Sequence, residues 1–161
     1  MQRLIAGCAA LALAAFASHA VAAPFDPIGD LLQKIQDVGQ SAISAPVRLM
    51  RATLYHSGHG VGVRDSMGCR AVPMRTLAVD PHIVPKGTVV FIKETVGLAM
   101  PDGELHDGLW YASDVGGAIK GERIDLYTGA GQSSMRTLMP LNLKSLSVST
   151  VRTFDGCPPV T

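Results

Sequence analysis

Three hydrophobic patterns follow one another along the chain of 161 residues. An apolar run from Leu4 to Phe16 comes first. Apolar residues at helical spacing follow, up to Pro46, and from Val47 onward short β-type segments alternate with Gly and Pro. The pattern predicts a leader over residues 1–23, an amphipathic helix with a linker over 24–46, and one mainly β domain over 47–161.

The β-type region contains six candidate strands. Each is rich in Val, Ile, Thr, Tyr or Phe and is bounded by turn residues. The predicted strands are Val47–Tyr55, Arg75–Asp80, Gly87–Glu94, Leu109–Val115, Arg123–Gly129 and Ser145–Phe154. Residues 133–143 are expected to hold one short helical turn. Many short strands with few helices indicate a closed barrel or a sandwich.

The predicted N-terminal helix has its own start signal and an apolar stripe. Asp26 can cap it and Pro27 suits its first position. The stripe consists of Ile28, Leu31, Leu32, Ile35 and Val38. Because a helix of this length is marginal alone in water, the stripe of helix 27–44 needs a partner. The main domain, a second copy of the chain and another envelope protein all stay open as that partner.

Residues 1–23 have the pattern of a secretory signal peptide. A basic start at Arg3 precedes the apolar run, and small residues end just before Pro24. The run is too short to span a membrane, and no other segment of the sequence is a candidate. The pattern predicts export to the periplasm or cell envelope, with a mature chain starting at Ala23 or Pro24. Lipidation at Cys8 is a minor alternative, since the apolar stretch lies mostly after that cysteine.

The charge balance argues against two classes of partner, and the cysteine content predicts a disulfide. Without Arg3, the 14 basic residues fall to 13, equal to the 13 acidic residues. This balance argues against a nucleic-acid partner or an anionic lipid surface. Cys69 and Cys157 remain in the mature chain, and two cysteines in an oxidising compartment most often form a disulfide. Two separate buried thiols are the alternative.

The common signatures of cofactor and metal chemistry are absent from the sequence. It has no nucleotide-binding loop, no Gly-x-Ser-x-Gly elbow and no His-Glu-x-x-His motif. His56 and His59 are three residues apart, but Gly58 and Gly60 make their loop too flexible to fix metal geometry. The sequence therefore predicts neither a metal nor a cofactor.

Three aspartates lie at unusual positions. Asp80 and Asp114 lie at the C-terminal ends of predicted strands, and Asp125 lies within one, on the face opposite Ile124 and Leu126. A carboxylate on a strand is costly to desolvate unless it is paired or lies in a solvated cleft. Carboxylates that share a cleft push their pKa values apart, which suits acid–base catalysis. The structural alternative is ion pairing with Arg75, Lys120 or Arg123.

The block Gly-Gly-Ala-Ile-Lys-Gly between Asp114 and Asp125 strongly resembles the signature of the three-aspartate (3D) domain. Leu77–Pro81 and Ile83–Thr88 resemble the first part of that signature, and the resemblance extends from about Thr53 to Gly129. It implies a six-stranded double-psi β-barrel. It also implies relatives in the membrane-bound lytic transglycosylase A group, which cleave the bond between N-acetylmuramic acid and N-acetylglucosamine and leave a 1,6-anhydro sugar.

The resemblance also implies roles for individual residues. Asp125 matches the catalytic acid, Asp114 the aspartate beside it in the cleft, and Asp80 the first of the three. Substrate contacts are expected from Thr53, Tyr55, Gly116, Gly117 and Lys120. Trp110 and Tyr127 either stack on sugar rings or belong to the core.

These residues lead us to expect a peptidoglycan lytic transglycosylase-like enzyme that acts on glycan strands. The transglycosylase A enzymes carry a large additional domain that forms the other wall of their groove, whereas here the resemblance covers the barrel. Two other functions therefore stay open. One is a non-catalytic peptidoglycan- or polysaccharide-binding barrel of expansin type. The other is a glycan hydrolase of endoglucanase type.

Overall fold

The structure is a computed structural model that describes residues 28–29, 31–36, 45–58 and 63–160. Its strands are β1 (Arg48–Ser57), β2 (Thr76–Val79), β3 (Thr88–Ile92), β4 (Leu109–Asp114), β5 (Arg123–Ala130) and β6 (Ser145–Thr153). All six predicted strands are present, each with both ends within two residues of the expected positions. Three 3-10 helices connect them: η1 (Lys93–Thr95), η2 (Gln132–Arg136) and η3 (Met139–Leu141). The last two replace the single turn expected at residues 133–143.

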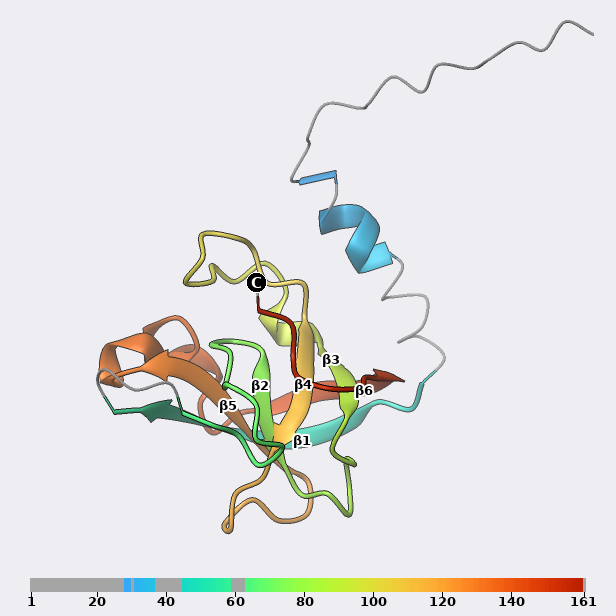
Figure 1. Cartoon of the computed structure of the whole chain (residues 1–161). Coiled ribbons are helices and arrows are strands. Elements are labelled where there is room, and N and C mark those ends of the chain that lie inside the picture. The colour runs from blue at the N-terminus through green and yellow to red at the C-terminus, as the bar shows by residue number, and fades with distance from the viewer. Residues whose placement is uncertain (1–27, 30, 37–44, 59–62, 161) are drawn as a thin grey trace, which may run out of the picture.

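The six strands form one closed ring in the order β1-β5-β2-β4-β3-β6 (Figure 1). The pairs β1–β5 and β2–β4 are parallel, and the other four pairs are antiparallel. Closure pairs every strand on both sides, so the sheet exposes no free edge. The mainly β prediction is confirmed, and the closed ring excludes a sandwich of two separate sheets.

The interior of the ring is filled by alternate residues of the strands. Leu77 and Val79 of β2 and Ile124 and Leu126 of β5 belong to one apolar cluster and are fully buried. Trp110 also belongs to this cluster, and its indole Nε1 donates a hydrogen bond to Thr95 Oγ1 at 3.0 Å. Of the two interpretations of Trp110, the core interpretation is therefore confirmed.

One disulfide fastens the C-terminal tail to the ring. It joins Cys69 in the segment before β2 to Cys157 beyond β6, and their Cα atoms are 5.5 Å apart. The predicted pairing is confirmed. The bond closes a loop with a sequence separation of 88 residues, so it constrains most of the domain.

The N-terminal predictions are described only in part. Residues 28–29 and 31–36 have helical backbone. The leader, the remainder of the predicted helix 27–44 and His59 lie outside the described residues. Within the described part of the chain, no helix is long and apolar enough to cross a bilayer. The helix bounds and the partner of its apolar stripe stay predictions.

Candidate active site

Strand alternation places Asp125 on the outer face of the ring. Its neighbours Ile124 and Leu126 point into the core, so Asp125 projects outward and is half-buried. In the parallel pairing of β1 with β5, Thr53 lies directly opposite Asp125 and shares its face. We call the outward side chains Thr53, Tyr55, Asp114 and Asp125 the acid face.

Asp114 reaches the acid face because of a register shift in the pairing of β2 with β4. β2 lies between β4 and β5, and its Ala78 is the cross-strand partner of both Asp125 and Asp114. The shift between Leu77 and Ala78 brings Asp114, in place of Ser113, opposite Ala78. Since paired strands lie about 4.8 Å apart, the two acidic residues stand on backbones roughly 10 Å apart, separated by one strand.

The surroundings of the Asp125 carboxyl favour its protonated form. Its Oδ1 accepts one hydrogen bond, from Thr53 Oγ1 at 2.8 Å. Burial raises the pKa of the Asp125 carboxyl, and the negative charge of Asp114 raises it further, while the Thr53 hydrogen bond opposes the rise. A larger fraction of Asp125 is thus protonated at a given pH than of an ordinary aspartate, as a general acid requires.

Asp114 has a different environment on the same face. Its Oδ2 accepts a hydrogen bond from the Tyr55 hydroxyl at 2.8 Å, and its Oδ1 accepts from the backbone N–H groups of Ser66 at 3.0 Å and Val115 at 2.9 Å. Burial and the charge of Asp114 raise the pKa of Tyr55, so its hydroxyl stays protonated and keeps donating. Two neighbouring carboxyl groups with contrasting surroundings are typical of sites that divide acid and electrostatic roles.

The Asp80 carboxylate accepts hydrogen bonds from backbone N–H groups and makes none with Asp114 or Asp125. Its Oδ2 accepts from the N–H of Gly121 at 2.9 Å and its Oδ1 from the N–H of His82 at 3.1 Å. These two hydrogen bonds lower the pKa of Asp80, and the charge of Lys120 adds to the effect. The geometry makes Asp80 the anchor of the loop between β4 and β5, and its expected catalytic role stays a prediction.

That loop carries the other expected substrate contacts. A Cβ at Gly116 would lie 2.7 Å from Ile119 Cγ1, so the packing of the turn explains this glycine. Gly117 is exposed and a Cβ there would meet nothing within 4 Å. Lys120 is also exposed. Gly117 and Lys120 are thus open to a ligand, whereas the missing side chain of Gly116 serves the fold.

The ion pairs of the described residues leave the three aspartates out. They are Arg48–Glu122 at 3.7 Å and Arg75–Asp107. Arg75, one of the partners considered for the strand aspartates, is therefore used by Asp107. The structural alternative of salt bridges at Asp80, Asp114 and Asp125 finds no support here.

Sequence reasoning missed two polar features near the ring. The backbone N–H of Ser66 contacts Asp114, and only the pairing of Cys69 with Cys157 hints that this segment is held against the domain. His106 is fully buried, with Nε2 2.6 Å from Met74 O and Nδ1 accepting from Gly108 N–H at 2.8 Å. Burial lowers the pKa of His106 to about 4, so this histidine is neutral and structural.

Within the described residues, no three His, Cys, Asp or Glu side chains gather as metal ligands.

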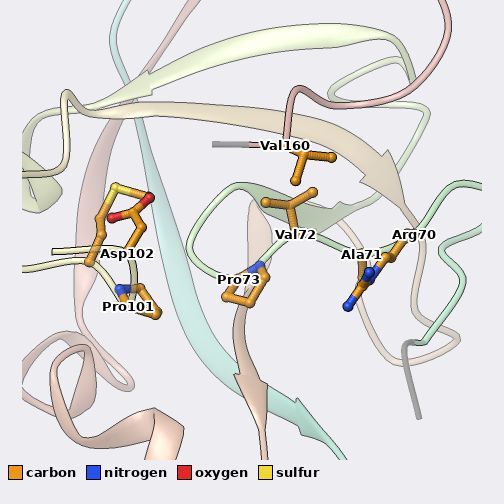
Figure 2. A pocket seen from close by; sticks show the side chains of 8 residues that line it. Arg70, Ala71, Val72, Pro73, Pro101, Asp102 and Val160 are labelled. Carbon is orange, nitrogen blue, oxygen red and sulfur yellow. The ribbon is translucent and has the colours of Figure 1, made fainter. Parts of the chain in front are cut away.

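A pocket of about 330 Å³ lies away from the acid face. Figure 2 shows it between the segment before β2, the loop before β4 and the C-terminal tail. Its lining residues are Arg70, Ala71, Val72, Pro73, Met100, Pro101, Asp102 and Val160. None of the predicted site residues lines it, so the candidate site is the open acid face.

Comparison with known proteins matches residues 75–138 to the family model of the 3D domain. The resemblance seen in the sequence is thus confirmed. The chain is 36% identical over 78 residues to the "Membrane-bound lytic murein transglycosylase A homolog" of Buchnera aphidicola subsp. Schizaphis graminum. That alignment covers 44% of this chain and 21% of the relative, so the chain spans about a fifth of the length of that protein.

Solved structures of lytic transglycosylases also resemble the chain. Escherichia coli MltA with bound chitohexaose is 28% identical, with a TM-score of 0.45, over 58% of this chain and 29% of that one. LtgG of Burkholderia pseudomallei is 29% identical, with a TM-score of 0.40, over 56% of this chain and 28% of that one.

Proposed function

Starting from the 3D domain at residues 75–138, we propose that the protein is a lytic transglycosylase-like enzyme. Its substrate is peptidoglycan, and it cleaves the bond between N-acetylmuramic acid and N-acetylglucosamine. The observation that carries the proposal is the half-buried Asp125, with its raised pKa, one strand away from Asp114. The name of the 36%-identical relative supports the same class of reaction.

In the first half of the reaction, Asp125 acts as a general acid. Its protonated carboxyl donates the proton to the glycosidic oxygen while the bond from that oxygen to the anomeric carbon breaks. The sugar passes through an oxocarbenium-like transition state, which carries positive charge. The negative charge of Asp114 on the same face stabilises that charge and keeps the pKa of Asp125 raised.

In the second half, Asp125 acts as a general base. Its carboxylate accepts the proton of the C6 hydroxyl of the same sugar, and the C6 oxygen bonds to the anomeric carbon. This step regenerates the acid and gives a 1,6-anhydro end. Because the substrate supplies the nucleophile, a second nucleophilic carboxylate is not required. Thr53 orients Asp125 through Oδ1 and leaves Oδ2 for the substrate.

The finer description of the fold and location belongs to this proposal. The two parallel pairs, β1–β5 and β2–β4, within a closed ring of six strands support a double-psi barrel. The disulfide suits an oxidising compartment and supports export to the periplasm or cell envelope.

One observation favours a second candidate, a non-catalytic glycan-binding domain. The acid face lies on the outer surface of the ring and is not enclosed by the described residues, which suits binding to the side of a polymer. Digestion of purified sacculi followed by mass spectrometry separates the candidates. Fragments with 1,6-anhydro ends support the transglycosylase, and new reducing ends indicate a hydrolase. Sacculi that bind the protein and stay intact identify a binding domain.

A further inference from the structure

Two arginines lie side by side on the outer face, next to Asp125. Arg51 of β1 and Arg123 of β5 are direct cross-strand partners, and both are exposed. Each lies two positions before a residue of the acid face, Thr53 and Asp125 respectively. Strand alternation therefore turns all four side chains to the same side, with the arginine pair about 6–7 Å along the strands from the proposed acid.

The chain gives neither guanidinium group a partner among the described residues. Glu122, the nearest acidic residue in sequence, pairs with Arg48 at 3.7 Å. Asp80 follows β2, which pairs with β5, but its two oxygens accept backbone N–H groups. Arg51 and Arg123 hydrogen-bond only through their backbone within this part of the chain.

This arrangement is unfavourable for the isolated domain. Like charges directly opposite each other on paired strands destabilise a sheet. An anion bound between the two guanidinium groups would remove the repulsion. Guanidinium groups bind carboxylates with paired, charge-assisted hydrogen bonds, so a carboxylate is well suited to this position.

We propose that Arg51 and Arg123 form a subsite that binds a carboxylate group of the substrate held at Asp125. The inference rests on the proposed function and adds specificity to it. Peptidoglycan carries carboxylates on the lactyl group of its muramic acid, where the peptide is missing, and otherwise on its stem peptides. A neutral chitin-type glycan has neither. The subsite therefore makes the domain favour the anionic polymer over a neutral chain of the same linkage.

The test compares affinities for three glycans of matched length. They are a peptide-free peptidoglycan oligomer with free lactyl carboxylates, a peptide-bearing oligomer, and a neutral chitooligosaccharide. Binding is measured on the full chain carrying Asp125→Asn, so that no cleavage occurs. We expect about fivefold tighter binding of at least one anionic glycan at low salt, with the preference weakening as salt rises.

Variants assign this preference to the arginine pair. Arg51→Gln and Arg123→Gln should each lower the ratio of anionic to neutral affinity toward one. Arg152→Gln, which changes an exposed arginine on β6, should keep the ratio. Melting temperatures no lower than that of the Asp125→Asn parent show that the fold of each variant is unchanged. Arg51→Gln and Arg123→Gln should raise the melting temperature slightly, because each removes one charge of the opposed pair. The preferred anionic glycan identifies the carboxylate as lactyl or peptidic.

The results distinguish a failure of the carboxylate subsite from a failure of the proposed function. If all three glycans bind equally, or if Arg51→Gln and Arg123→Gln keep the full preference, the carboxylate subsite is refuted while glycan binding stands. If no glycan binds at all, both the subsite and the proposed function are refuted.

Discussion

At the scale of single residues, the candidate site depends on the contrast between Asp114 and Asp125. Among the described residues, Asp114 accepts three hydrogen bonds and Asp125 accepts one. Burial and the charge of Asp114 raise the pKa of Asp125. The two groups stand on the same face with Ala78 between them. Asp125 is therefore the carboxyl of the pair that is suited to carry a transferable proton.

Asp125→Asn should slightly stabilise the folded protein at neutral pH. Because the folded-state pKa of Asp125 is raised, the folded state binds more protons than the unfolded state above about pH 3.9, and stability falls as pH rises through that window. Asparagine does not titrate, so Asp125→Asn removes this loss of folding stability. The gain should be less than about 1 kcal/mol, since water screens the half-exposed group.

Thermal unfolding of both proteins between pH 3 and 8 measures this effect. The melting temperatures should converge at the acid end and separate toward neutral pH. A variant that is much less stable at every pH would instead make Asp125 a structural residue.

Asp114→Asn should move the alkaline limb of the pH–activity profile to lower pH. The charge of Asp114 contributes to the raised pKa of Asp125, and its removal lowers that pKa, so the acid form is lost earlier as pH rises. Tyr55→Phe is the matched control, because it removes one hydrogen bond to Asp114 but keeps the charge. A profile that Asp114→Asn leaves in place contradicts the electrostatic role.

At the scale of elements, the loop between β4 and β5 is positioned by Asp80. Asp80→Asn should lower the melting temperature more at pH 7 than at pH 3. The pKa of Asp80 is lowered in the folded state, so its contribution is present above the unfolded pKa and is lost as pH falls through the folded value. Asp155→Asn, an exposed aspartate in the C-terminal tail, is the control.

Hydrogen exchange locates the effect of Asp80→Asn. The Gly121 amide, which donates to Asp80 Oδ2, should exchange faster in the variant. Unchanged exchange at Gly121, with unchanged stability, would show that Asp80 does not anchor the loop.

The strands themselves were predictable, because alternation and turn residues mark each of them locally. The outward direction of Asp125 followed from Ile124 and Leu126 for the same reason. The pairing of Thr53 with Asp125 was not predictable, since it depends on a parallel contact between strands far apart in sequence. The position of Asp114 depends on a register shift at Ala78, which leaves no pattern in the sequence. The outward direction of Arg123 could have been predicted, because Arg123 lies two residues before Asp125 on the same strand and therefore faces the same side.

At the scale of the whole molecule, the disulfide is expected to supply a large part of the stability. Replacing both cysteines, Cys69→Ala with Cys157→Ala, should lower the free energy of unfolding by about 4 kcal/mol on the chain-entropy account of a long closed loop. The same change loosens the segment whose Ser66 amide contacts Asp114. Denaturant unfolding with and without reductant measures the loss. An unchanged midpoint after reduction would contradict it.

The central claim is that Asp125 transfers the proton in glycan cleavage. The most direct measurement is mass spectrometry of the soluble products from purified sacculi incubated with wild-type protein or with Asp125→Asn. We expect fragments with 1,6-anhydro ends from the wild type, and from the variant a rate lower by at least about 10²-fold with the fold intact. Wild-type protein that binds sacculi but releases no such fragments at any pH would contradict the claim, as would a folded Asp125→Asn variant that releases them at the wild-type rate.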